Sequence, residues 1–328
     1  MLGDVLDDPQ HYITGWELSR KRYSRAQRSL GHYYIQRAKW AEAIECYEVA
    51  LSINPLFPSS WFSCGCAAMR IEKWDAATNA FSRCISLEPE EGEAYGNLAA
   101  VYMIQGKLDK AHSAMQIGLK HKRENWKLWE NYQHVCMALR DFQSVIQTVL
   151  QIFDLNDKKV DIKVLQVLAD FVVKDDTDKS GINGRRIEKP VSEMFGKITS
   201  RLTNNPDVWR VYSSYHHSLG NLDKAIDLQQ RACRAIEATQ GWDTDKESFE
   251  RVVSFIATLV NLYLEQTPTN STNIHSAKLK VNSIIKKTEL SFKELDTFKS
   301  LSTLLANLDA KLSNPNTVSE AMQEVPSS

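Results

Sequence analysis

The sequence contains no long apolar run. No uncharged apolar stretch approaches the roughly 18 residues that a membrane span requires. The opening MLGDVLDDPQ has neither the basic start nor the apolar stretch of a signal peptide. We therefore expect no membrane insertion and an intracellular, cytoplasmic protein, with nuclear residence left open.

An excess of one charge is also missing, with 40 Lys and Arg against 41 Asp and Glu in 328 residues. No overall field would draw such a chain to nucleic acid or to anionic lipid, so either ligand would need a local basic patch. RNA binding by pentatricopeptide arrays depends on a strongly basic groove. We therefore do not expect nucleic acid as a direct ligand.

Cysteine is scarce, with 6 residues in the chain, and a reducing compartment would keep them as thiols. Cys64, Cys66 and Cys84 lie near one another in the sequence, but no second close pair or His-x₃-His completes a zinc set. We predict that these thiols belong to the core. We expect no disulfide, metal, cofactor or small-molecule substrate.

The chain does contain an internal repeat. WAEAIECYEVALSINP, from Trp40 to Pro55, recurs as WDAATNAFSRCISLEP, from Trp74 to Pro89, with a period of 34 residues. With each closing Pro at position thirty-two of a unit, units begin at Ser24, Pro58, Gly92 and Trp126, and a later one at Pro206.

Particular positions of the unit carry a shared kind of residue. Position four is mostly aromatic, and positions eight and twenty are mostly Gly or Ala. Small residues there would let two antiparallel helices approach closely, while the large one would fill a neighbouring groove. The predicted packing residues are Gly31, Ala43, Trp61, Gly65, Ala77, Tyr95, Ala111 and Ala225.

This pattern resembles the tetratricopeptide repeat, closely in the first three units and more loosely in the fourth. The resemblance implies an all-α solenoid, in which antiparallel helix pairs stack into a right-handed superhelix, with C-terminal helices outside the repeat as a cap. A single helical pair cannot cover its own apolar face, which is why such units occur in runs.

The pattern also predicts how the chain is divided. Residues 1–23 are interpreted as the remnant of a preceding repeat, and 24–157 as four tandem repeats. A degenerate helical pair follows at 158–205, with a polar loop at 175–190. A further repeat spans 206–240, capping helices span 241–312, and 313–328 is predicted to be a disordered tail.

Three segments outside the repeat consensus carry a closer resemblance: WELSRKRYSRAQRSLG at 16–31, LWENY at 128–132 and MFGKITSRLTNNPDVWRVY at 194–212. They are similar to the carboxy-terminal part of the tetratricopeptide repeat protein 27 family, over a region from about Leu2 to Trp242. The resemblance implies an intracellular helical scaffold that takes part in chaperone-assisted assembly of large complexes, spliceosomal particles among them.

Partners of such a solenoid would lie in the concave groove, which the first helix of each unit lines at positions two, five, nine and twelve. The predicted groove is basic at one end and turns apolar through Phe62, Met69 and Met103, and Met is an adaptable lining for a peptide. An alternative is that each of these residues contacts only the adjacent repeat. The candidate groove residues are Arg28, His32, Phe62, Met69, Asn97, Met103, Lys127 and His134.

Some repeats of this class bind the C-terminal carboxylate of heat-shock chaperones through five Lys, Asn and Arg side chains. In units two to four of this chain, Asn97 and Lys127 match, whereas Phe62, Cys66 and Asn131 replace the other three. Two matches cannot supply the charge-assisted donors that hold a carboxylate. We therefore do not expect direct binding of this kind.

No enzyme motif appears: the sequence has no nucleophile elbow, no His-Glu-x-x-His helix and no Gly-rich phosphate loop. The adjacent pair His216 and His217 would point in different directions on a helix, which favours structural roles. We therefore predict no catalytic residues and a non-catalytic scaffold that binds other proteins. Two alternatives stay open. WKLWENY at 126–132 is typical of RNA-processing repeats, and NNPDVWRVY at 204–212 loosely matches the alpha subunit of protein prenyltransferases.

Overall fold

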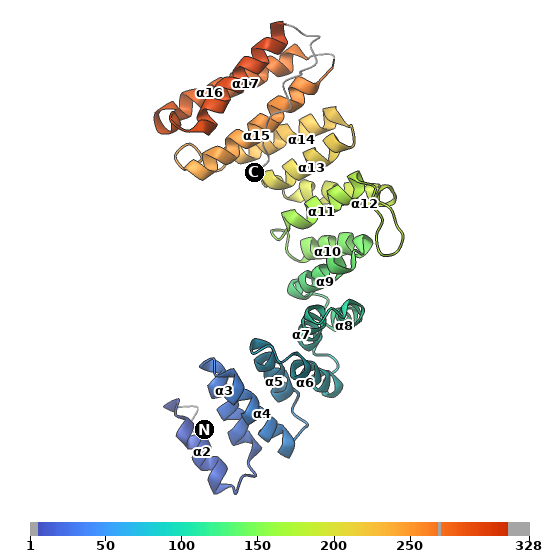
Figure 1. Ribbon diagram of the computed structural model, residues 1–328, viewed down its shortest axis with the longest axis vertical. Coiled ribbons are helices and arrows are strands. Elements are labelled where there is room, and N and C mark those ends of the chain that lie inside the picture. The colour runs from blue at the N-terminus through green and yellow to red at the C-terminus, as the bar shows by residue number, and fades with distance from the viewer. Residues whose placement is uncertain (1–5, 268–269, 314–328) are drawn as a thin grey trace. The chain divides into compact units, whose positions relative to one another are not determined.

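Helices make up the regular structure of the computed structural model, which describes residues 6–267 and 270–313 (Figure 1). The strand-like pairing in these ranges is a single antiparallel bridge between Thr177 and Asn183. The chain forms two units, Met1–Lys159 with Asp178–Ser180, and Val160–Thr177 with Gly181–Ser328. The predicted all-α tetratricopeptide fold is thereby confirmed for the described residues.

Within the part of unit 1 that the structure describes, helix α2 (Pro9–Leu18) precedes four antiparallel pairs (Figure 1). The first helices begin at the residues that open the predicted repeats, Ser24, Pro58, Gly92 and Trp126. The pairs are α3 (Ser24–Gln36) with α4 (Trp40–Ile53), α5 (Pro58–Arg70) with α6 (Trp74–Leu87), α7 (Gly92–Ile104) with α8 (Leu108–His121), and α9 (Trp126–Leu139) with α10 (Phe142–Leu155).

Close packing inside the first three pairs of unit 1 depends on the small residues at positions eight and twenty. Ala43, Ala77 and Ala111 are fully buried, and a Cβ on Gly31 would stand 3.0 Å from the ring of Tyr47. Of the predicted packing residues, all but the half-buried Trp61 are buried. No larger side chain could occupy these positions without a shift of the helices.

The turn between the two helices of a unit has one conformation throughout. Position fifteen has a positive φ in all five repeats, at Ala38 (57°), Glu72 (59°), Gly106 (71°), Arg140 (56°) and Gly220 (80°). Glycine tolerates this left-handed conformation, whereas Ala, Glu and Arg adopt it at a cost of about 1–2 kcal/mol. The glycines were recognisable as turn residues in the sequence, but the other three were not.

The tryptophans at position four have a role beyond filling space. Each indole donates a hydrogen bond to a backbone carbonyl of the linker that precedes its unit, with a distance of 2.8 Å in every case: Trp61 to Pro55, Trp129 to Arg123 and Trp209 to Thr203. Because the acceptor lies outside the helix, this bond fixes how the chain enters the unit.

Unit 2 contains α11 (Ile162–Val173), α12 (Gly184–Arg201), α13 (Pro206–Ser218), α14 (Leu222–Glu237), α15 (Lys246–Glu265), α16 (Ser271–Phe292) and α17 (Asp296–Ser313). The pair α13 and α14 is the repeat that the sequence places after Pro206. Beyond it, α15 packs on α14 and is covered in turn by α16 and α17. Apart from Ser313, the predicted tail at 313–328 lies outside the described residues.

Helix α12 begins inside the segment predicted as a polar loop, so the predicted loop 175–190 is wrong at its C-terminal end. Helix α12 continues through Pro190, although a proline inside a helix costs about 3 kcal/mol. Its buried stripe compensates: the helix buries Ile187, Val191, Met194, Phe195 and Ile198 at helical spacing. The loop that precedes α12 also stabilises the start of this helix, because Asp175 accepts a hydrogen bond of 3.0 Å from the backbone N–H of Arg185.

None of the helices within residues 6–267 and 270–313 has both the length and the hydropathy to cross a membrane.

Candidate protein-binding surfaces

The face of unit 1 that the sequence predicts as a groove lies on α3, α5, α7 and α9, and α3 contacts α5, α5 contacts α7 and α7 contacts α9. We call it the first-helix face and define it by the eight candidate groove residues. None of the eight is fully buried: His32, Lys127 and His134 are exposed, and the other five are half-buried.

The basic end of the first-helix face is occupied by Arg28 and His32. The Arg28 guanidinium lies 3.7 Å from the centroid of the Phe57 ring, a cation–π contact with the linker that precedes α5. The ring of His32 forms a hydrogen bond of 3.2 Å with Gln36 on its own helix. Arg28 is therefore partly engaged by the next repeat, while His32 is open to solvent.

The middle of the first-helix face is apolar. Phe62 packs edge-on against Phe81 with 5.8 Å between ring centroids, and Phe62, Cys66 and Met69 lie at the edge of the core of repeats one to three. Asn97, from the third repeat, donates a long hydrogen bond of 3.8 Å to the Cys66 sulfur of the second. The structure therefore connects α5 and α7 on this face through Cys66 and Asn97.

The far end of the face carries Met103, Lys127 and His134. In the described part of the chain, these three side chains form no hydrogen bond or ion pair with one another. The Lys127 ammonium lies 5.9 Å from the Trp126 ring centroid on the same helix. Five positions of this face correspond to those that bind a chaperone C-terminal carboxylate in other repeats. Asn97 and Lys127 match two of them, whereas the phenyl ring of Phe62, the thiol of Cys66 and the amide of Asn131 replace the other three donors.

All six cysteines are free, and burial makes their thiols poor nucleophiles. Burial raises the pKa of the Cys66 thiol to about 11 and the pKa values of Cys64 and Cys136 to about 12. With pKa values this high, these thiols remain protonated near neutral pH. Because only the thiolate is a good nucleophile and metal ligand, they are poorly reactive. Within the described ranges, no group of three or more His, Cys, Asp and Glu side chains could hold a metal ion.

Unit 2 has a hollow of about 420 Å³ on the corresponding face, lined by α11, α13 and α15. Its apolar lining comes from Ile162, Val211 and Leu262. Its ionisable lining consists of Lys163, Arg210 and His217. This hollow was not predicted, because the predicted groove residues come from the first four repeats only. In the repeat that starts at Pro206, the same rule selects Asp207, Arg210, Ser214 and His217.

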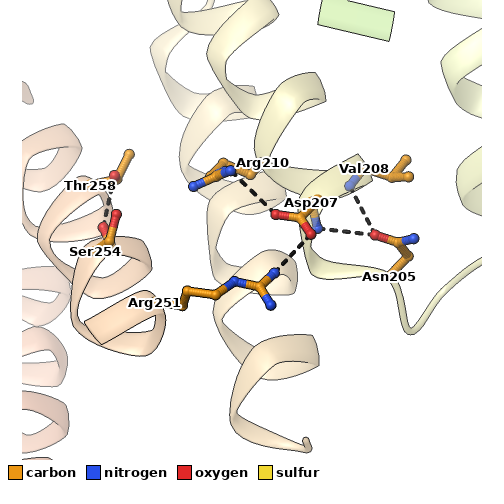
Figure 2. A network of polar contacts seen from close by, with 7 residues as sticks. All are labelled: Asn205, Asp207, Val208, Arg210, Arg251, Ser254 and Thr258. Carbon is orange, nitrogen blue, oxygen red and sulfur yellow. Dashed lines mark hydrogen bonds and ion pairs between the residues drawn. The ribbon is translucent and has the colours of Figure 1, made fainter. Parts of the chain in front are cut away.

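One carboxylate beside the hollow is shared by two arginines, as Figure 2 shows. Asp207 accepts from Arg210 of its own helix at 3.2 Å and from Arg251 of α15 at 2.9 Å. Asn205 caps the start of α13 by accepting from the backbone N–H groups of Asp207 and Val208, at 3.1 and 3.3 Å. The cap fixes Asp207 in place, and Asp207 in turn connects α13 to α15.

A hydrogen bond also connects the same two helices, because His217 Nε2 lies 2.6 Å from the Glu265 carboxylate. Its sequence neighbour His216 is buried between the rings of Tyr212 and Tyr215, and neither of its ring nitrogens has a recorded hydrogen-bond partner. Burial, assisted by the positive charge of Lys224, lowers the pKa of His216 to about 4. The two histidines thus point in different directions, and His216 is a neutral core residue.

Comparison with known proteins supports the class of protein that these helices define. Two family models, both described as tetratricopeptide repeat, match the chain, one at residues 28–58 and the other at residues 65–120. Among solved structures, a crystal structure of MamA aligns with 46% of this chain and 87% of its own, at 19% identity and a TM-score of 0.44. The family matches and the repeated helical pairs make the chain a tetratricopeptide-repeat protein.

The predicted relationship to the tetratricopeptide repeat protein 27 family is also confirmed. The chain is 57% identical to the tetratricopeptide repeat protein 27 homolog of Dictyostelium discoideum, over 94% of this chain and 36% of that protein. It is 32% identical to a TPR repeat-containing protein of Schizosaccharomyces pombe, over 80% of this chain and 33% of that protein. The chain therefore spans about a third of the length of these curated relatives.

Proposed function

We propose that this chain is a non-catalytic scaffold that binds partner proteins on the first-helix face of unit 1. The observation that carries the proposal is that three apolar side chains of this face, Phe62, Met69 and Met103, are only half-buried. Phe62 and Met69 pack against the core of repeats one to three, and all three side chains keep part of their surface available to a partner. Adaptable Met side chains beside an aromatic anchor are the composition of surfaces that accommodate peptides and helices.

The finer role that we propose is chaperone-linked assembly of large complexes, including spliceosomal particles, inside the cell. Family resemblance supports it. The replaced clamp positions argue that any cooperation with chaperones uses a contact other than a C-terminal carboxylate clamp. A fluorescently tagged chain should be found in the cytoplasm, the nucleus or both, and retention in a membrane fraction would contradict this role.

The experiment is affinity capture of the tagged chain followed by mass spectrometry, with and without nuclease. A scaffold should recover the same proteins at steady stoichiometry after nuclease treatment. Loss of the partners with nuclease would indicate an RNA-processing repeat instead. Activity that appears only with one co-purified chain would indicate a subunit of an enzyme.

Variants can assign the partners to the first-helix face. Phe62→Ala and Met103→Ala should each reduce recovery of partners about tenfold, as expected for the loss of an interface anchor. The matched control is Ile117→Ala, because Ile117 is 41% exposed on α8, outside this face. Circular dichroism and thermal unfolding should show that all three variants remain folded. Full recovery with both face variants would contradict the proposal.

A further inference from the structure

The hollow of unit 2 differs in chemistry from the first-helix face of unit 1. About 420 Å³ lies between three helices, within the range of volumes that ligand sites occupy. Its lining combines the apolar side chains of Ile162, Val211 and Leu262 with three ionisable side chains, Lys163, Arg210 and His217, all of them basic. A ligand in the hollow would therefore meet both nitrogen donors and aliphatic carbon.

The carboxylates near the hollow are outside its lining and already accept hydrogen bonds. Asp207 accepts from Arg210 and Arg251, and Glu265 pairs with His217. On α11, Asp170 accepts from the side-chain amide of Gln166 at 2.8 Å. None of these acids competes for the space of the hollow itself.

Because Arg210 and Arg251 share the single carboxylate of Asp207, a net positive charge remains beside the hollow. One carboxylate can neutralise only one of the two guanidinium groups that it contacts. Arg210 uses a single amine nitrogen for this contact, and its guanidinium keeps further N–H donors for another acceptor. Lys163 is exposed and forms no ion pair with any described residue. Two cations from different helices, α11 and α13, are thus available to one ligand.

We propose that this hollow docks an acidic peptide segment of a partner protein, with at least two carboxylates and an intervening apolar side chain. One carboxylate pairs with Lys163 and the other with Arg210, while the apolar side chain covers Val211 and Leu262. Single-stranded nucleic acid fits less well, because no aromatic ring lines the hollow for base stacking. The site belongs to unit 2, so the inference does not depend on the first-helix face of unit 1.

The test is fluorescence anisotropy with the full chain and two short labelled peptides, one of alternating Asp and Leu and one of alternating Asn and Leu. The acidic peptide should bind at least about tenfold more tightly, because charge-assisted hydrogen bonds are stronger than neutral ones. Rising salt should weaken its binding. Equal affinity for the two peptides, or no binding of either, would overturn the proposal.

Variants test the named residues. Lys163→Gln and Arg210→Gln should each weaken the acidic peptide about tenfold, whereas the control Lys189→Gln, on the exposed side of α12, should not. Asp207→Asn should tighten it several-fold, because both arginines lose the negative charge of their internal partner. This last variant keeps the test decisive if Arg210→Gln disturbs the fold, and unchanged affinity in Asp207→Asn and Lys163→Gln would refute the assignment.

Two further arms separate this site from its alternatives. A single-stranded RNA oligonucleotide of similar length should bind more weakly than the acidic peptide, and tighter binding would replace the peptide assignment with nucleic acid. Phe62→Ala should leave the affinity for the acidic peptide unchanged. Loss of peptide binding in that variant would overturn the assignment to unit 2, while loss of cellular partners alone would bear only on unit 1.

Discussion

Gly65 lies directly against the ring of Phe81, and a Cβ added to Gly65 would stand 2.8 Å from the ring atoms Cε1 and Cζ. Real Cβ atoms do not approach a ring so closely, so Gly65→Ala must displace Phe81 or separate α5 from α6. Phe81 is fully buried, which leaves its ring no free space. We expect Gly65→Ala to lower the free energy of unfolding by about 1–3 kcal/mol, measured by urea denaturation.

Gly196 provides the matched control, because it also lies inside a helix but nothing stands within 4 Å of an added Cβ. Gly196→Ala should raise the free energy of unfolding by up to about 1 kcal/mol, since Ala has the higher helix propensity. If both variants were stabilised equally, close packing at position eight would not be what requires glycine.

The left-handed turn at position fifteen gives a second prediction. Ala38 has φ 57° and is exposed, so Ala38→Gly changes little besides the backbone strain. We expect a gain of roughly 0.5–1 kcal/mol, the strain relieved less the extra entropy of glycine in the unfolded chain. Gly106→Ala is the reverse change at an equivalent turn with open space around it, and it should cost about the same amount. Denaturation curves that shift in the same direction for both variants would contradict this explanation.

The register of the repeat can be tested at Ala77, which is fully buried on α6. Ala77→Arg places a long cation where two helices cross, and overpacking together with burial of charge should cost several kcal/mol. Asn79→Arg, on the exposed side of the same helix, should cost less than about 0.5 kcal/mol. Thermal unfolding followed by circular dichroism measures both, and a parent-like melt of Ala77→Arg would show that the register is wrong.

Much of this architecture could be predicted because close helix packing requires small residues at fixed positions of the repeat, and these positions can be recognised in the sequence. Ala43 and Ala77 are small for the same steric reason, and the helix starts at Pro58 and Trp126 follow from that spacing. The same sequence could not show that α12 continues through Pro190. Local propensity disfavours a helix there, and only the tertiary burial of residues such as Val191 and Phe195 reverses the balance.

The candidate sites were harder to predict than the fold. Groove positions in unit 1 followed from the repeat, but the contact between Asn97 and Cys66 depends on how far apart α5 and α7 lie. In unit 2, the same positional rule would have selected Arg210 and His217, but the predicted groove residues came from the first four repeats only. The contacts of Asp207 with Arg251 and of His217 with Glu265 could not be predicted, because these partners are 44 and 48 residues apart in the sequence and meet only when α15 packs on α14.

The buried His216 makes stability depend on pH in a defined window. Burial holds its pKa at about 4, below the ordinary 6.5 that it regains on unfolding. Above pH 6.5 the residue is neutral in both states and has no effect. Between pH 6.5 and 4, His216 becomes protonated in the unfolded chain but stays neutral in the folded chain. The free energy of unfolding therefore falls by up to about 3 kcal/mol as the pH is lowered.

His216→Phe should remove this part of the pH dependence, because a phenyl ring cannot be protonated. Urea denaturation at pH 7.5, 6 and 5 measures it, with His134→Gln as the exposed control that should retain the parent's slope. A parent-like slope in His216→Phe would show that the loss of stability in acid arises elsewhere.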